Sequence, residues 1–211
     1  MPAPLPRLNR KFYLQDPVTV AKQLLGQQLV HVVNGQRIAG LIVETEAYLG
    51  EIDQAAHSFK GRRTRRTETM FAIGGTSYVY LNYGIHHLFN IVVAEIDVPQ
   101  AVLIRAIEPT EGIELMQLQR PKANQPTDLA SGPGKLGAAF CLDLSHNGLD
   151  LTTHKTLYVE QLRSRCLPKS HIVESARIGV DYAEQWAKAP LRFTIKGNPH
   201  VSVKPSDENS A

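Results

Sequence analysis

The feature that most constrains the fold of this chain is an Asn-Gly pair that joins two runs rich in β-branched residues. The runs are QLVHVV at 28–33 and RIAGLIVET at 37–45, and they meet near Asn34-Gly35. Asn and Gly adopt positive φ angles at low cost, which a two-residue hairpin turn requires at both central positions. The sequence therefore predicts two adjacent antiparallel strands near the N-terminus.

Further strands and helices are expected along the rest of the chain. Strand-like runs occupy 77–83, 88–95, 101–107, 157–160 and 191–196. Apolar residues at helical spacing predict helices at 113–120 and 134–142, and we also expect a helix to begin near Ser170. Another should begin at Asp16-Pro17, an N-cap residue followed by proline at the first helical position. The pattern predicts one mixed α/β domain with a central sheet.

Length and composition set the limits of this domain. The 211 residues suffice for one domain or two small ones. Two cysteines are too few for a disulfide framework or a Cys-rich zinc site and favour a reducing compartment. No run approaches the roughly 18 apolar residues of a membrane span, so we expect a cytoplasmic protein without membrane contact. A proline-rich start and a polar end predict flexible segments at 1–10 and 204–211 around a folded body at 11–203.

A block of acids is followed at once by a block of bases. The acids are Glu44, Glu46, Glu51 and Asp53, and the bases are Lys60, Arg62, Arg63, Arg65 and Arg66. An Arg-rich loop can neutralise nucleic-acid phosphates, because each guanidinium binds a phosphate through two hydrogen bonds. A solvated surface loop is the alternative interpretation of such a run.

Glu44 and Glu46 lie two residues apart and therefore share one face of the predicted strand. Such carboxylates can bind a metal, act as a general base on water or face solvent. With Asp53 and His57 they lack the ligand spacings of a zinc helix or a calcium loop, so no metal is expected and a metal-dependent nuclease is the weaker alternative. Arg105, inside the apolar run AVLIRAI, either pairs structurally with a strand carboxylate or holds Glu46 ionised, and either role predicts a contact between them.

Tyrosines are concentrated in the segment GGTSYVYLNYG, which contains Tyr78, Tyr80 and Tyr83, and Tyr48 follows the carboxylates. Such rings can sandwich a planar base, although they are also ordinary residues of a sheet. Tyr83 precedes Gly84, where the strand should turn, and a ring at a turn beside a basic loop suggests a wedge into DNA.

Two polar features interrupt the apolar pattern later in the chain. Asn90, within LFNIVV, requires hydrogen-bond partners if it is buried. The segment SGPGK at 131–135 indicates a helix start whose free N–H groups could meet a phosphate, with a plain helix start as the alternative.

Several of these segments match one known family. VETEAYLG at 43–50, AAHS at 55–58, TSYVYLNYG at 76–84 and SGPGKL at 131–136 resemble motifs of the alkyladenine (methylpurine, or 3-methyladenine) DNA glycosylases. LIRAIEP at 103–109, ARIGV at 176–180 and KAPLRFTIKGNPHVS at 188–202 extend the resemblance from about Gly40 to Val203. It implies an α+β fold: a single glycosylase domain at 11–203 with a curved, mainly antiparallel sheet, surrounding helices and a protruding β-hairpin.

The resemblance implies base excision repair, in which a damaged purine is flipped out of double-stranded DNA and its N-glycosidic bond is hydrolysed. Expected substrates are 3-methyladenine, 7-methylguanine, hypoxanthine and ethenoadenine. We expect a monofunctional enzyme without a cofactor, because no pocket lysine matches a Schiff-base role. It should act as a monomer in the cytoplasm, on the nucleoid in a bacterium. A non-catalytic damaged-DNA-binding protein is the alternative.

The motif match assigns roles to individual residues. Glu46 is expected to be the general base, with Arg105 and the main-chain carbonyl near Ile178 holding the water or the carboxylate. The other residues of the expected base pocket are Tyr48, His57, Tyr80 and Asn90, the last of which would crowd the amino group of guanine. Tyr83 would intercalate into the DNA, and the expected phosphate contacts are Arg62, Arg63, Arg65 and Lys135. Asn82 departs from the family pattern, which implies an apolar residue there.

Overall fold

The computed structural model describes residues 5–205. The strands are β1 (Gln28–Val33), β2 (Gln36–Tyr48), β3 (Ser77–Asn82), β4 (His86–Val93), β5 (Gln100–Glu111), β6 (Leu157–Glu160), β7 (Ile172–Ser175) and β8 (Arg192–Ile195). The helices are α1 (Arg10–Tyr13), α2 (Pro17–Leu24), α3 (Ile113–Gln119), α4 (Pro126–Ala130) and α5 (Pro133–Ala139). Short 3-10 segments are η1 (Gly50–Ile52), η2 (Phe59–Gly61), η3 (Glu68–Phe71), η4 (Leu144–His146), η5 (Lys169–His171) and η6 (Asp181–Lys188).

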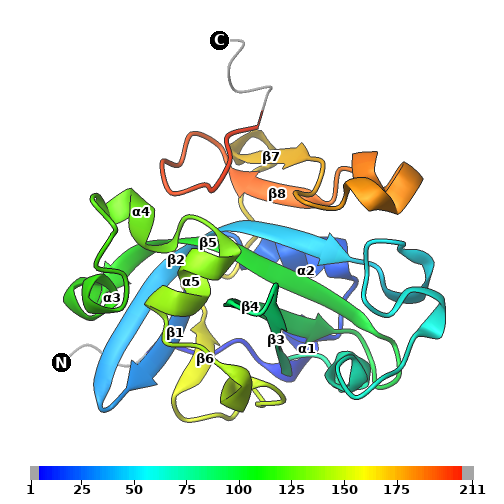
Figure 1. The fold of residues 1–211 in the computed structure, drawn as a ribbon, viewed down its shortest axis with the longest axis horizontal. Helices are drawn as coiled ribbons and strands as arrows, with labels where there is room; N and C mark the ends of the chain where they lie inside the picture. The colour runs from blue at the N-terminus through cyan, green and yellow to red at the C-terminus, as the bar shows by residue number, and fades with distance from the viewer. Residues whose placement is uncertain (1–4, 206–211) are drawn as a thin grey trace.

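The strands form one curled antiparallel sheet in the order β3-β4-β5-β2-β1-β6, with β8 pairing with β2 and β7 with β8. The long strand β2 causes the curl, because its first half pairs with β1 and its segment 44–46 pairs with β8. Figure 1 shows β7 and β8 as a separate arm above the end of β2. The predicted α+β fold with a curved antiparallel sheet is confirmed.

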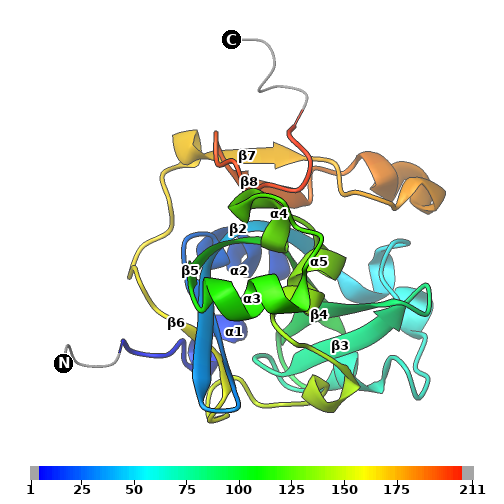
Figure 2. The same ribbon diagram turned by 60° about the vertical axis from the view of Figure 1, so that its left-hand side comes forward.

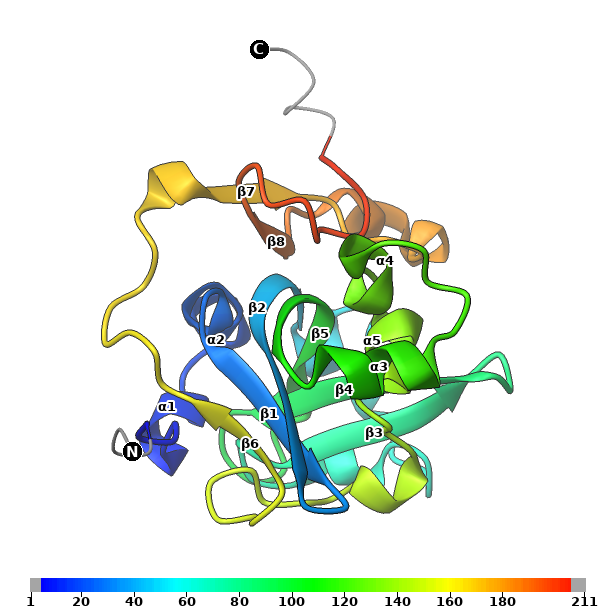
Figure 3. The ribbon, with the colours of Figure 1, turned by 90° about the vertical axis from the view of Figure 1, so that its left-hand side faces the viewer.

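Helices cover both sides of the two central strands. In Figures 2 and 3, α2 lies on one side of β2 and β5, and α3, α4 and α5 lie on the other. As predicted, α2 begins after Asp16, whose side chain accepts a hydrogen bond from the Thr19 N–H at 2.9 Å. Helix α5 packs directly on β4, where a Cβ at Gly137 would lie 2.1 Å from the His87 carbonyl oxygen. Only glycine permits this approach, so α5 is held close to the β3–β4 hairpin.

The β3–β4 hairpin projects from the body, as expected, and ends in a tight turn (Figure 3). Tyr83 and Gly84 occupy the two central positions with φ angles of 49° and 73°, and the Ile85 N–H donates to the Asn82 carbonyl at 3.1 Å. This is a type I′ turn, which prefers Asn-Gly and rarely contains tyrosine. The Tyr83 side chain is 90% exposed at the tip.

Two expectations about the termini and the late helices need correction. Within the segment expected to be flexible at 1–10, Arg7 forms a β-bridge with Glu160, Leu8 is buried and Arg10 begins α1, so residues 5–10 are packed on the body. Residues 1–4 and 206–211 of the two expected flexible segments lie outside the described residues. The helix predicted near Ser170 is wrong, because Ile172–Ser175 pairs with β8 as strand β7.

No helix within residues 5–205 is long and apolar enough to cross a membrane.

Candidate active site

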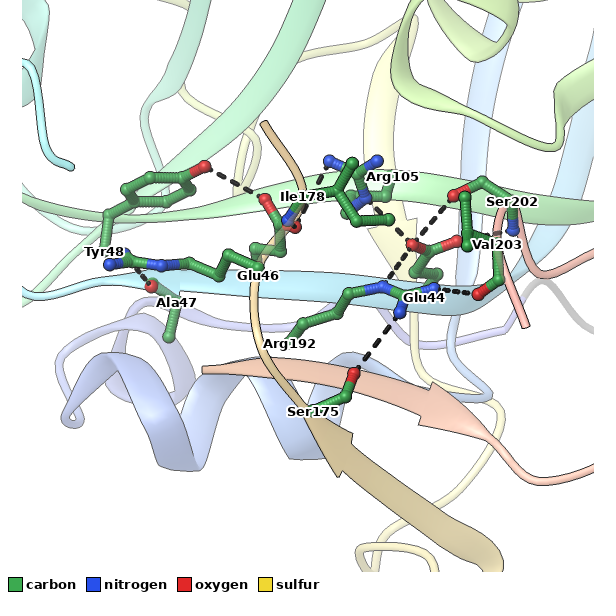
Figure 4. Close-up of polar contacts among 11 residues, drawn as sticks. Glu44, Glu46, Ala47, Tyr48, Arg105, Ser175, Ile178, Arg192, Ser202 and Val203 are labelled. Carbon is green, nitrogen blue, oxygen red and sulfur yellow. Dashed lines mark hydrogen bonds and ion pairs between the residues drawn. The ribbon is translucent and has the colours of Figure 1, made fainter. Parts of the chain in front are cut away.

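Two β-bulges in the centre of the sheet arrange the ionisable residues. In the ladder between β2 and β5, Val43 has no partner on β5 and Arg105 has no partner on β2. Bulges re-aim side chains and recur beside active sites. Next to these bulges, Glu44 and Glu46 lie on the same side of β2 as Arg105 (Figure 4). All three side chains are nearly inaccessible to solvent.

Glu44 is fully committed to structural contacts (Figure 4). Its Oε1 accepts hydrogen bonds from Arg105 Nε at 2.8 Å, Arg192 Nε at 2.7 Å and Ser202 Oγ at 2.9 Å, and its Oε2 accepts from the Ser202 N–H at 2.7 Å. Burial alone would raise the pKa of Glu44, but Arg105 and Arg192 outweigh it and lower the pKa below its ordinary value. The four contacts occupy the acceptor capacity of this carboxylate.

Glu46 has fewer partners, and each of them lines a cavity. Its Oε1 accepts a hydrogen bond from the Ile178 N–H at 2.8 Å and lies 3.2 Å from Arg105 Nη1, while its Oε2 accepts from the Tyr48 hydroxyl at 2.9 Å. The predicted contact between Arg105 and Glu46 is thus confirmed. Three contacts leave one acceptor position of the carboxylate free for a water molecule. The peptide group at Ile178 presents its N–H to the carboxylate, a contact that the sequence did not predict.

The cavity has a volume of about 280 Å³ and opens between the β3–β4 hairpin and the segment after β7. Its lining includes every residue predicted for the base pocket, namely Tyr48, His57, Tyr80, Asn90 and Ile178. Tyr83 lies at its rim, and Arg105 also contributes to its lining. Tyr78, one of the tyrosines that the sequence indicated as able to sandwich a base, lines it as well, as does Tyr182, which the sequence did not single out.

Aromatic rings form one wall of this cavity. The His57 ring meets the Tyr80 ring at a centroid distance of 4.7 Å and an interplanar angle of 73°, and His57 Nδ1 lies 3.0 Å from the Tyr78 hydroxyl. Burial, and then the nearby charges of Arg66 and Arg62, lower the pKa of His57 to about 4. The His57 ring is therefore neutral at pH 7.

The Tyr48 ring is held from outside the cavity. Arg177 lies over its face with the guanidinium carbon 4.6 Å from the ring centroid, and Asp53 binds Arg177 through two contacts of 2.5 and 2.8 Å. Arg177 also donates to the Ala47 carbonyl at 2.9 Å. Burial and the charge of Glu46 raise the pKa of Tyr48 well above its ordinary value, so its hydroxyl keeps the proton that it donates to Glu46.

Asn90 is a buried polar residue of β4 and has the partner that its burial requires. Its Nδ2 donates to the Tyr78 carbonyl oxygen at 3.1 Å, across the β3–β4 pair. This contact fixes the amide in the lining of the cavity.

The basic loop divides into paired and unpaired arginines. Arg63 binds Glu68 and Asp97, both at 2.7 Å, and stacks over Phe71, so its charge is compensated. Arg62 and Arg65 are exposed and form no ion pair with another described residue. Lys135 on α5 is partly exposed, with Asp128 at 3.9 Å.

Each acid near the cavity forms an ion pair with an arginine, and the acids do not converge on a common point. Glu44 and Glu46 share Arg105, and Asp53 binds Arg177. Across residues 5–205, no group of three or more His, Cys, Asp or Glu side chains is arranged to hold a metal ion.

The residues that sequence reasoning missed are long-range partners. Arg192 is 148 positions from Glu44, and Arg177 is 124 positions from Asp53. The only local indication for Arg177 is its place beside Ile178 in the ARIGV motif. Arg66 was part of the basic run but was not assigned to the site, although its guanidinium carbon lies 5.1 Å from the Tyr80 ring centroid.

A buried carboxylate at an aromatic-walled cavity, beside an exposed basic loop, defines a class of protein: a hydrolase with a pocket for a planar group of a nucleic acid. The model of the methylpurine-DNA glycosylase family matches residues 11–199. A relative from Bacillus cytotoxicus is 48% identical over 90% of this chain and 97% of its own length. Relatives from Clostridium perfringens and Natranaerobius thermophilus are 46% and 44% identical over 94% and 93% of this chain, and over 100% and 99% of their own lengths. All three are provisionally named 3-methyladenine DNA glycosylase.

The chain belongs to the methylpurine-DNA glycosylase family, which confirms the resemblance seen in its motifs. It is a DNA-binding repair enzyme that hydrolyses N-glycosyl bonds of DNA.

Proposed function

We propose that this enzyme flips alkylated or deaminated purines out of duplex DNA into the cavity and hydrolyses their N-glycosidic bonds with a water activated by Glu46. The substrates proposed are 3-methyladenine, 7-methylguanine, hypoxanthine and ethenoadenine. The relatives' names support the first of these. The enzyme acts on double-stranded DNA as a monomer.

The observation that carries this proposal is the unequal use of the two neighbouring carboxylates. Glu44 has four hydrogen-bond donors around it, whereas Glu46 has three contacts and one free acceptor position beside the cavity. Arg105 Nη1 lies 3.2 Å from Glu46 Oε1, so a guanidinium faces the carboxylate that would act as the general base. Glu46 accepts a proton from the water while the water oxygen attacks C1′ of the sugar. The bond between C1′ and the purine nitrogen breaks, and its electron pair leaves with the purine, which takes up a proton as it departs if it is a neutral base. The carboxylate also stabilises the positive charge that develops on the sugar.

The aromatic walls would hold the flipped base. A planar purine fits between the Tyr48 ring and the rings of His57 and Tyr80, because stacking on aromatic side chains suits any purine face. In this arrangement the His57 peptide N–H donates to the purine. Asn90, fixed by its bond to Tyr78, crowds the amino group of guanine and so disfavours that normal base.

The projecting hairpin and the basic surface would hold the DNA. The exposed Tyr83 ring fills the gap that the flipped nucleotide leaves in the base stack. Arg62, Arg65 and Lys135 contact phosphates, and Arg63 contributes less because Glu68 and Asp97 already compensate its charge.

The test of the proposal is single-turnover excision of hypoxanthine or ethenoadenine from a duplex oligonucleotide in EDTA, comparing the wild type with Glu46→Gln. The amide keeps the size of the side chain but cannot accept a proton, so we expect excision to slow at least 100-fold. Binding of the lesion duplex should remain. Glu51→Gln, at an exposed acid five residues away, is the matched control and should excise at the wild-type rate.

Two results would contradict the proposal. A Glu46→Gln enzyme that excises within a few-fold of the wild type would remove Glu46 from the role of general base. A wild type that binds the lesion duplex but releases no purine from any of the four substrates would contradict the substrate assignment.

A further inference from the structure

Both tyrosines that would stack on the flipped base have an arginine against the ring. Arg177 lies over Tyr48 at 4.6 Å, and Arg66 lies over Tyr80 at 5.1 Å, measured from guanidinium carbon to ring centroid. The two tyrosines line the base cavity, and neither arginine does. Each guanidinium therefore lies against a ring of the cavity wall without itself lining the cavity.

The two arginines differ in their charge balance. Asp53 compensates Arg177 through two short contacts in the interior. Arg66 is exposed, forms no ion pair with any acid in the described part of the chain, and lines a second cavity of about 300 Å³ together with Arg62. The Tyr80 ring thus has against it a cation that no acid of the described residues pairs with.

The pKa of the neighbouring His57 responds to the same positive charge. The groups that face the His57 ring are the Tyr78 hydroxyl, the Tyr80 ring and the two arginines Arg62 and Arg66. After burial, the charge of Arg66 is the next largest cause that lowers the pKa of His57, followed by that of Arg62. A positive group inside the pocket is therefore disfavoured at this wall.

We propose that Arg66 is a specificity-determining residue, which places an uncompensated positive charge against the Tyr80 ring and thereby disfavours cationic purines relative to neutral ones. The inference rests on the proposed function, since it concerns the purines bound in that pocket. A purine methylated at N3 or N7 carries a positive charge, whereas hypoxanthine and ethenoadenine are neutral.

The physical reason is competition for one aromatic ring. A cation is attracted to the negative face of an aromatic ring, and this attraction favours a cationic base stacked on Tyr80. The Arg66 guanidinium already interacts with the π electrons of the Tyr80 ring without lining the cavity. Its positive charge repels a cationic base stacked on the same ring. A neutral base meets no such repulsion, so Arg66 shifts the preference of the enzyme without contacting the base.

The experiment is a competition in which a duplex with 3-methyladenine and a duplex with hypoxanthine share one limiting enzyme. The ratio of the two excision rates gives the ratio of their kcat/KM values. In Arg66→Met we expect this ratio to rise about tenfold in favour of 3-methyladenine. Arg66→Lys, which keeps the charge, should stay near the wild-type ratio.

Arg65→Met is the matched control, because Arg65 is an exposed cation of the same loop that lies over no aromatic ring of residues 5–205. A residue that only contacts phosphate, or only maintains the fold, changes both rates in proportion and leaves their ratio fixed. The ratio thus separates the proposed role from both of these.

An independent measurement follows the His57 ring by NMR in the DNA-free protein, with the His57→Asn variant used to assign its resonance. The pKa of His57 should rise in Arg66→Met and stay unchanged in Arg66→Lys. An unchanged pKa in Arg66→Met, an unchanged excision ratio, or equal ratios in the Met and Lys variants would each overturn the inference. A wild type that excises neither base would overturn the proposed function, and this inference with it.

Discussion

At the scale of single residues, two glutamates that look equivalent in the sequence have different partners in the structure. Both lie on the same face of β2 and both are inaccessible to solvent. Arg105 contacts both, with Nε on Glu44 and Nη1 on Glu46. The second arginine and the serine around Glu44 make it a structural centre, whereas the three contacts of Glu46 all come from residues that line the cavity.

Glu44→Gln should therefore destabilise the protein. The change leaves Arg105 and Arg192 buried without the carboxylate that both share, and breaking a buried ion pair of this kind costs about 3 kcal/mol. Urea denaturation monitored by circular dichroism measures the loss, with Glu51→Gln as the exposed control. A loss below about 1 kcal/mol would contradict the structural role of Glu44.

The same variant should change how stability depends on pH. The pKa of Glu44 in the folded protein is below its ordinary value near 4.5, so its contribution is fully present above that value. This contribution is lost as the pH falls through the lowered pKa, because protonation removes the negative charge with which Glu44 binds Arg105 and Arg192 in the folded state. The wild type should thus lose stability more steeply than Glu44→Gln below pH 4.5.

At the scale of secondary-structure elements, turns and bulges set the directions of the functional side chains. The paired bulges at Val43 and Arg105 keep an arginine on the acidic face of the sheet without changing the register of the rest of β2 and β5. The type I′ turn projects the Tyr83 ring from the hairpin, but it forces a tyrosine into the left-handed region at φ 49°. This conformation carries a cost in stability of about 1 kcal/mol.

Tyr83→Asn should therefore stabilise the protein while impairing it as an enzyme. Asn-Gly is the preferred pair for a type I′ turn, so we expect the free energy of unfolding to rise by about 1 kcal/mol. Excision should slow, since Asn is too small to fill the space of a flipped nucleotide. Thermal denaturation and single-turnover excision of hypoxanthine, measured on the same preparation, provide the test. Wild-type excision by this variant would exclude Tyr83 as the wedge.

At the scale of the whole molecule, the cavity, the projecting hairpin and the basic loop come from separate parts of the chain and lie at one opening. The cavity draws its lining from β2, the β3–β4 hairpin, β5 and the segment after β7. The basic loop adjoins it through the second cavity, which shares Ala55, His57 and Tyr182 with the first. A duplex positioned by the basic loop would thus present its bases to the cavity.

DNA binding should distinguish the two neighbouring arginines of this loop. For an undamaged duplex, Arg62→Ala should lower the slope of log K against log salt by about 1, because one phosphate contact is lost. Arg63→Ala should change the slope less, since Glu68 and Asp97 already compensate its charge. Fluorescence anisotropy at several salt concentrations measures both slopes. Equal decreases would show that the ion pairs of Arg63 open when DNA binds.

Much of the fold and the composition of the site could be predicted from local sequence. The Asn34-Gly35 turn, the cap of α2 at Asp16 and the strand runs of the sheet all depend on neighbouring residues, and the structure has each of them. The helix predicted near Ser170 failed because pairing of β7 with β8, which is distant in sequence, decides the conformation there. Tertiary contacts override a local preference of this size.

The sequence by itself determined which chemical groups this enzyme has: the acids of β2, the tyrosines of the hairpin, the arginines of the loop and the family to which they belong. The tertiary structure alone decided which acid is enclosed by arginines, which arginine is compensated and which cations lie against the aromatic walls. The reason is physical. Protonation, charge balance and free hydrogen-bonding capacity depend on groups within a few ångströms in space. Some of these groups, such as Arg192 at Glu44 and Arg177 at Asp53, come from positions more than a hundred residues apart.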